Sequence, residues 1–178
     1  MPELSLHFAV TFALVAPVLG LRKAAIVSFI SLLPDLDFLF YLHRSLSHSI
    51  TILLVVSLVA VSFVRRLKPS LFSLTSIGCL SLLAHPIMDI FSGPTPLLWP
   101  LVKESVSMSI NVALVAGGSL RFSWTFLVEW FPASVSPIPV TQGAMVGPIF
   151  TSEGFVVSLL LVAVPILVVL LRQKSVRA

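Results

Sequence analysis

Apolar runs long enough to cross a lipid bilayer recur along this chain. A membrane-spanning helix needs about 20 consecutive apolar residues. Five segments approach this length, at residues 4–20, 24–42, 50–64, 71–91 and 155–171. Of the 178 residues, 57% are hydrophobic and 10% are charged, with a mean hydropathy of +1.10, which leaves too little polar surface for a water-soluble domain. We therefore predict an all-α fold, a polytopic helical membrane bundle of about five spans in a lipid bilayer.

One integral membrane domain, residues 1–178, is expected, with polar motifs in residues 1–104 and a last span at 154–172. Residues 105–153 combine an apolar run, Trp124, Trp130 and a proline-rich piece. Proline and glycine are tolerated at membrane depth only where protein or water satisfies the backbone. This stretch is therefore predicted to be re-entrant or interfacial, or else a hairpin that crosses the membrane within residues 105–131.

Basic residues favour one orientation in the plasma (inner) membrane. Five alternating spans would place eight of the eleven on one side: Arg22, Lys23, Arg65, Arg66, Lys68, Arg172, Lys174 and Arg177. By the positive-inside rule this side is cytoplasmic, so the N-terminus is expected outside and the C-terminus inside. The first segment lacks a basic start and a clear cleavage motif, so we expect a retained helix. Because the basic residues form no patch, nucleic-acid binding is not expected.

Histidine and aspartate are scarce, and all of them fall toward the outer ends of the expected spans. Carboxylates within a bilayer are costly unless a cation, a partner or water compensates their charge. Imidazoles beside carboxylates favour a cation, and the single cysteine, Cys79, offers no thiolate cluster. The mixture suits a divalent metal, Zn²⁺ first, with Mn²⁺ or Fe²⁺ possible. The candidate ligands are His7, Asp35, Asp37, His43, His48, His85 and Asp89.

Spacing supports a shared site. His85 and Asp89 lie four residues apart, on one face of a helix. Asp35 and Asp37 would diverge on a regular helix, but Pro34 makes a local irregularity plausible there. His43 and His48 flank an expected turn in which Ser47 or Ser49 can cap the next helix.

Other interpretations of the polar residues remain open. Asp37 can instead pair with Arg44, and Arg44 can bind a phosphate or carboxylate or serve as a structural partner. A metal-ion or proton transporter would also use intramembrane histidine and aspartate, although the cytoplasmic halves of the spans are almost purely apolar. A third alternative is a non-catalytic membrane protein with a structural metal.

The polar motifs resemble the signature of the YdjM-like family of predicted membrane-bound metal-dependent hydrolases. The resemblance covers roughly the first hundred residues. Its pieces are His7, Pro34-Asp35-Leu36-Asp37, His43-Arg44-Ser45-Leu46-Ser47-His48-Ser49, His85-Pro86-Ile87-Met88-Asp89, and Gly93 with Leu97-Leu98-Trp99-Pro100. The pattern is also distantly similar to zinc-dependent phospholipase C enzymes, which implies phosphoester chemistry.

Taken with this resemblance, the residues predict hydrolysis of a phosphoester in a lipid or lipid-linked substrate by metal-activated water. Asp37 or Asp89 would act as general base. Arg44 would stabilise charge that develops on the phosphate. The oligomeric state is left open.

Overall fold

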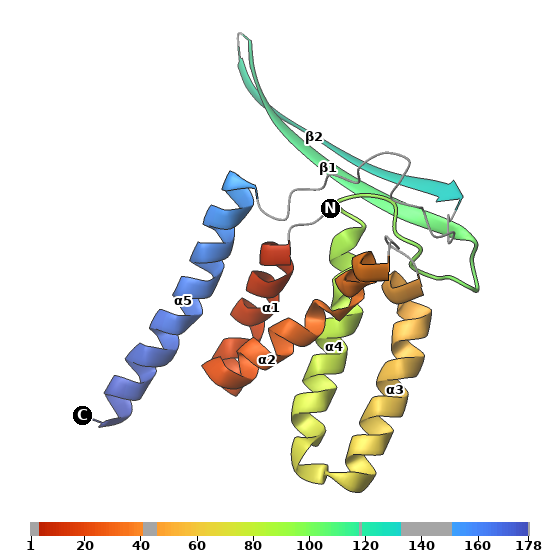
Figure 1. Ribbon diagram of the computed structural model, residues 1–178. Coiled ribbons are helices and arrows are strands. Elements are labelled where there is room, and N and C mark those ends of the chain that lie inside the picture. Colours follow the sequence, from red (N-terminus) through yellow and green to blue (C-terminus); the bar gives the residue numbers. More distant parts are fainter. Residues whose placement is uncertain (1–3, 41–45, 118, 133–150, 178) are drawn as a thin grey trace.

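The computed structural model describes residues 4–40, 46–117, 119–132 and 151–177. Helices predominate in these residues, together with one antiparallel hairpin (Figure 1). The helices are α1 (Leu4–Leu19), α2 (Leu21–Ser31), α3 (Ile50–Leu67), α4 (Phe72–Asp89) and α5 (Ser152–Arg177), and the strands are β1 (Glu104–Gly117) and β2 (Ser119–Pro132). Short 3-10 helices occupy η1 (Leu33–Phe40), η2 (Leu46–His48) and η3 (Pro69–Leu71).

The helices pack in the spatial order α5, α1, α2, α4, α3. Helix α1 contacts α2 and α5, α2 contacts α4, and α4 contacts α3. Gly20, at φ 78°, lets the chain reverse between α1 and α2. The α1/α2 turn, the α3/α4 turn and the C-terminal end of α5 lie at one end of the bundle, and η1, η2 and the hairpin lie at the other (Figure 1).

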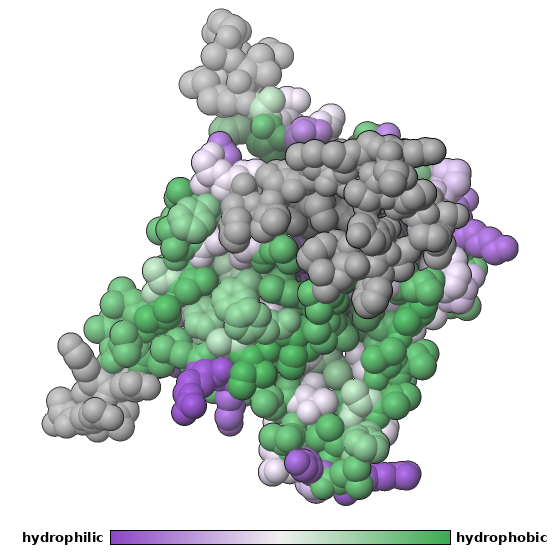
Figure 2. All heavy atoms as spheres, in the orientation of Figure 1, coloured by the Kyte–Doolittle hydropathy of each residue, from purple (hydrophilic) through white to green (hydrophobic). Residues whose placement is uncertain are grey.

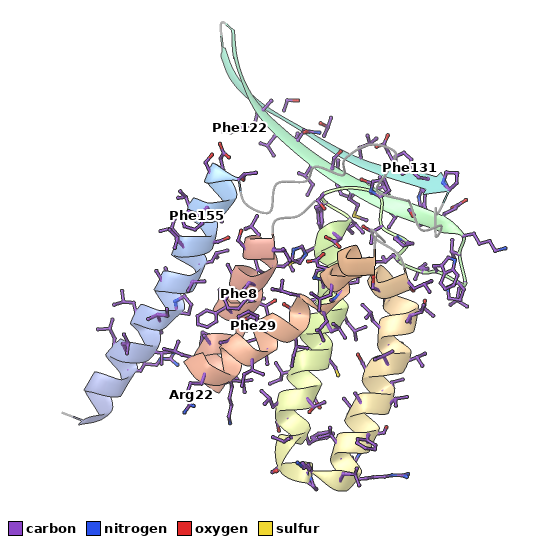
Figure 3. The ribbon with its side chains drawn as sticks, in the orientation of Figure 1. Phe8, Arg22, Phe29, Phe122, Phe131 and Phe155 are labelled. Carbon is purple, nitrogen blue, oxygen red and sulfur yellow. The ribbon has the colours of Figure 1, made fainter. Side chains whose placement is uncertain are left out.

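Small residues bring α1 and α2 together. Ala16 and Ala24 are fully buried beside Phe12, and Val162 and Ile166 of α5 pack against them. Nearer the other end, the rings of Phe8 and Phe29 meet edge to face at 5.1 Å between α1 and α2 (Figure 3). These contacts fix the position of α1, which carries His7, relative to α2, which leads to Asp35 in η1.

The outer surface of the helices is apolar. Val18, Phe63 and Leu80 are each more than 60% exposed, and hydrophobic side chains cover most of the visible helical surface (Figure 2). Such a surface suits lipid rather than water. Among the described residues three helices are long and apolar enough to span a membrane, Ile50–Leu67, Pro69–Asp89 and Ser152–Arg172. Because α1 has only 16 residues and α2 only 11, the prediction of five spans stays a prediction.

The segment at residues 24–42 was expected to be one span, and this is wrong. Helix α2 ends at Ser31, and η1 continues from Leu33 as a 3-10 helix. Pro34 explains the break, because proline has no N–H to donate and disfavours the α conformation of the residue before it. The irregularity expected at Pro34 is confirmed.

The described fold is mostly helical, as predicted, but it is not all-α, because residues 104–117 and 119–132 form the two strands of a β-hairpin. Strands β1 and β2 pair in register from Glu104 with Pro132 to Gly117 with Ser119. In β1 serine and asparagine alternate with apolar residues, a period of two that is typical of a strand with one apolar face. Serine and asparagine therefore recur at every second position within a stretch that composition alone marks as apolar.

Candidate metal centre

Four side chains converge at the end of the bundle that carries η1 and η2. Asp35 comes from η1, His48 from η2, and His85 and Asp89 from α4. One ligand atom from each lies within 4.8 Å of all the others. We call these four residues the central cluster.

Two imidazole nitrogens face two carboxylate oxygens in the central cluster. His48 Nε2 lies 3.0 Å from Asp89 Oδ2 and 3.5 Å from Asp35 Oδ1. His85 Nε2 lies 3.4 Å and 3.3 Å from the same two oxygens. The arrangement is a compact set of two nitrogen and two oxygen donors.

His7 and Asp37 border the central cluster on different sides. His7 Nε2 lies 3.6 Å from Asp89 Oδ1, and the His7 ring is 4.2 Å from the His85 ring between centroids. Asp37 Oδ2 lies 3.3 Å from His48 Nδ1, the nitrogen that points away from the cluster. A carboxylate in this place fixes the orientation of an imidazole whose other nitrogen binds a metal.

Local sequence explains how these side chains are held. The η1 turn after Pro34 sends Asp35 to the cluster and Asp37 to the far side of His48. Ser49 caps α3 by accepting a hydrogen bond from Ile52 N, so the capping prediction is confirmed for Ser49. His85 and Asp89 share a face of α4 at the expected four-residue spacing.

The loop after α4 ties the site together. Ile50 N donates to Leu97 O at 2.9 Å, and Ser49 Oγ donates to the carbonyl of Trp99. Thr95 pairs with Val106 at the start of β1 through two backbone hydrogen bonds. The start of α3, the end of α4 and the base of the hairpin are thereby joined around the central cluster.

Burial and hydrogen bonding in the central cluster fit a cation. The side chains of His48, His85 and Asp89 are at most 1% exposed, and that of Asp35 is 11% exposed. Both ring nitrogens of His85 and both carboxylate oxygens of Asp89 have no hydrogen-bond partner among the described residues. Burying a polar atom without a hydrogen-bond partner costs folding free energy. Donor atoms that converge without bonding to one another are arranged as the ligands of a common cation are.

The electrostatics at His48 point the same way. Burial lowers the pKa of His48, but the neighbouring carboxylates of Asp35, Asp37 and Asp89 outweigh it and raise the pKa to about 10. Carboxylates that hold a proton so firmly on an imidazole stabilise positive charge at this position. A divalent metal supplies such a charge, and two imidazoles with two carboxylates suit Zn²⁺, Mn²⁺ or Fe²⁺.

Six of the predicted site residues meet at this end of the bundle: His7, Asp35, Asp37, His48, His85 and Asp89. Their roles as ligands or general base stay predictions. His43 and Arg44 lie outside the described residues, and so does a contact between Arg44 and Asp37. Sequence reasoning assigned Ser47 only a possible capping role, yet its Oγ donates to Asp37 Oδ2 at 2.8 Å and lies 3.1 Å from His48 Nδ1. The sequence signal that could have identified Ser47 as a site residue is its position directly before His48.

Apolar helices that can cross a bilayer, joined to a buried histidine–aspartate cluster, define a membrane protein with a possible metal-binding site. The chain belongs to the YdjM inner membrane protein family, whose model matches residues 1–176. The resemblance to this family is therefore confirmed, and it extends well beyond the first hundred residues. No curated protein and no solved structure gives a significant match.

Proposed function

We propose that this protein is a membrane-embedded, metal-dependent hydrolase of phosphoester bonds in a lipid or lipid-linked substrate. The observation that carries the proposal is the central cluster, two imidazoles and two carboxylates buried in an apolar helical bundle. A cation is the simplest counterpart of such a set, and hydrolysis is the reaction class that the family resemblance favours.

Asp35, His48, His85 and Asp89 would hold the metal, which we propose to be Zn²⁺, with His7 beside it and His43 as a further ligand. The chemistry that a metal supplies in such a site is activation of water and polarisation of a phosphoryl oxygen. Asp89 Oδ2 faces the Nε2 atoms of His48 and His85, whereas Asp89 Oδ1 points toward His7. This leaves an oxygen of Asp89 that can accept the proton of the attacking water.

Asp37 is the other candidate for general base, and its contacts also favour a positioning role. It lies behind His48 and accepts a hydrogen bond from the hydroxyl of Ser47. A carboxylate placed there keeps His48 Nε2 directed at the central cluster. We propose that Arg44 neutralises charge on the phosphate as it develops, as an arginine fork can.

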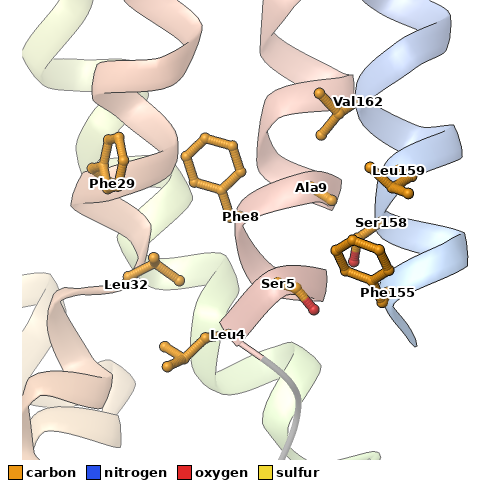
Figure 4. Close-up of a pocket in the computed structure, with 10 residues that line it drawn as sticks. All are labelled: Leu4, Ser5, Phe8, Ala9, Phe29, Leu32, Phe155, Ser158, Leu159 and Val162. Atoms are coloured by element: carbon orange, nitrogen blue, oxygen red, sulfur yellow. The ribbon is translucent and has the colours of Figure 1, made fainter. Parts of the chain in front are cut away.

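An apolar groove supports a lipid substrate. It lies between α1, α2 and α5, measures about 370 Å³, and is lined by side chains that include Phe8, Phe29, Leu32 and Leu159 (Figure 4). Phe8 follows His7 in α1, and Leu32 precedes Asp35 by three residues. Its volume is within the range of ligand pockets, about 300–1,000 Å³, and its lining suits an acyl or prenyl chain whose headgroup reaches the cluster.

We further propose that the central cluster faces the outer side of the plasma (inner) membrane. Arg22 lies at the end of the bundle with the α1/α2 turn (Figure 3), and Arg65 and Arg66 lie in the last turn of α3, at the α3/α4 turn of the same end. The positive-inside rule makes this end cytoplasmic, with the C-terminus inside and the N-terminus outside.

The test of function is metal analysis followed by turnover. Purified protein is expected to contain stoichiometric metal and to hydrolyse a member of a panel of phospholipids and lipid pyrophosphates. His48→Ala is expected to lose both metal and turnover, and Glu153→Gln, at an exposed carboxylate on α5, to keep both. Hydrolysis that persists in metal-free protein would refute the mechanism.

A structural metal is the second candidate, because four protein ligands can close a tetrahedral shell. Cobalt substitution separates the two candidates. A hydrolytic site keeps an open position, so its visible spectrum is expected to change when phosphate is added. An unchanged four-coordinate spectrum, with no turnover on the substrate panel, would favour the structural role.

A further inference from the structure

The β-hairpin has one apolar and one mainly polar face. Cross-strand partners share a face, and successive residues alternate between faces. The register pairs Val106 with Trp130, Met108 with Val128, Ile110 with Phe126, and Val112 with Trp124. Every member of these pairs is apolar, and we call them the apolar face.

The opposite face carries mostly hydroxyl, amide and carboxylate side chains. Its pairs are Ser105 with Phe131, Ser107 with Glu129, Ser109 with Leu127, Asn111 with Thr125, and Ala113 with Ser123. Leu127 and Phe131 are the large apolar exceptions. With these exceptions and Ala113, polar side chains occupy this side over residues 105–113 and 123–131, and we call it the polar face.

The apolar face is uncovered over most of its length. Trp124 is 73% exposed, Val112 69% and Ile110 57%, whereas Val106, at the base, is buried. Hydrogen bonds anchor this base: Val106 to Thr95, and Met108 N to Ile90 O at 2.7 Å, directly after Asp89. Beyond the base the hairpin extends across the end of the bundle, with Phe122 and Phe131 toward opposite ends of β2 (Figure 3).

We infer that the apolar face of the hairpin docks on the lipid bilayer at the interface, beside the end of the bundle that holds the metal centre. The inference does not depend on the proposed hydrolase function. Lipid is the occupant because the helices from which the hairpin extends already present an apolar outer surface to it. Tryptophan is also the side chain enriched at headgroup depth, and the face presents two.

The backbone fixes the depth. The described part of the sheet has only two strands, so beyond the base, where Val106 bonds to Thr95 and Met108 to Ile90, each strand has an outer edge with no strand beside it to pair its N–H and C=O groups. Such edges are not tolerated in the hydrocarbon core, where no water satisfies them. A hairpin with one apolar face and two open edges therefore lies at the interface rather than across the membrane.

The test compares neighbouring positions on opposite faces. Cys79→Ser removes the only cysteine, after which Val112→Cys and Asn111→Cys carry a spin label in the full chain. The protein is reconstituted in vesicles of phosphatidylethanolamine and phosphatidylglycerol. The label at 112 is expected to collide more with oxygen, which partitions into lipid, and the label at 111 more with a water-soluble nickel chelate. Equal exposure of both labels to the chelate would overturn the inference. Dipolar coupling between labels at 112 on two copies would also overturn it, since the face would then pack on a second chain.

A second measurement uses the native Trp124 of the apolar face as the probe. Trp99→Phe with Trp130→Phe leaves Trp124 as the only tryptophan. Its fluorescence is expected to be quenched by brominated lipids and protected from iodide in water. Quenching by iodide alone would contradict docking on the bilayer, whatever the labelled variants do.

Discussion

Asp37 differs from the other carboxylates of the site because it contacts the far side of an imidazole. Its Oδ2 lies beside His48 Nδ1 and accepts from Ser47. Removal of such a partner commonly weakens metal binding by about 10- to 100-fold. We predict that Asp37→Ala still binds metal, with affinity lower by this factor in a competition with a chromophoric chelator. Ser47→Ala is the milder control, and unchanged affinity in Asp37→Ala would show that the carboxylate does not orient His48.

Ser49 acts through the backbone at the start of α3. Its hydroxyl accepts from Ile52 N and donates to the carbonyl of Trp99. Loss of an N-cap costs about 1 kcal/mol. Ser49→Ala is predicted to lower the midpoint of thermal unfolding in detergent. Ser76→Ala removes an exposed hydrogen bond of a half-buried serine within α4 and is predicted to leave the midpoint nearly unchanged. Equal midpoints for the two variants would argue against the cap.

At the scale of elements, the packing of α2 on α4 sets the distance between Asp35 and the two ligands of α4. A Cβ at Gly78 would lie 3.3 Å from Ile30 Cδ1, a close approach of the kind that small residues allow between membrane helices. Gly78→Leu is predicted to cost about 1–3 kcal/mol through overpacking and to lower the metal content. Gly78→Ala is the matched control, because the end of the Ile30 side chain can move aside. Equal metal content in the two variants would show that metal binding does not depend on the distance between α2 and α4.

Two elements show where sequence reasoning succeeds and where it fails. The pairing of His85 with Asp89 follows from helical periodicity, and the irregularity at Pro34 follows from the missing N–H of proline, so both were predictable. The β-hairpin was missed because apolar composition was weighed above the alternation of Ser105, Ser107 and Ser109 with apolar neighbours. The position of Asp37 behind His48 depends on where η1 and η2 meet, which no local pattern specifies.

At the scale of the whole molecule, the metal is predicted to stabilise the fold. In the described residues the ion pairs of Asp35 and Asp89 are all with histidines, so without a cation their charge must be balanced by protons on buried imidazoles, which carries a desolvation cost. A ligand at 100 times its dissociation constant adds about 2.7 kcal/mol of stability.

Chelation is therefore expected to lower the thermal midpoint of the purified protein, and added Zn²⁺ to restore it. In His85→Ala the chelator is expected to have little effect, because the metal is already lost. A midpoint that chelation does not move in the unmodified chain would mean that the cluster is stable without a cation.

The metal centre is tested most directly by X-ray absorption at the edge of the metal found in the purified full chain. We predict one metal per chain, with two imidazole nitrogens and with carboxylate oxygens at about 2.0–2.2 Å if the metal is zinc. In His85→Ala we predict loss of one imidazole contribution or of the metal itself. A chain without stoichiometric metal, or a metal without imidazole ligands, would contradict this prediction.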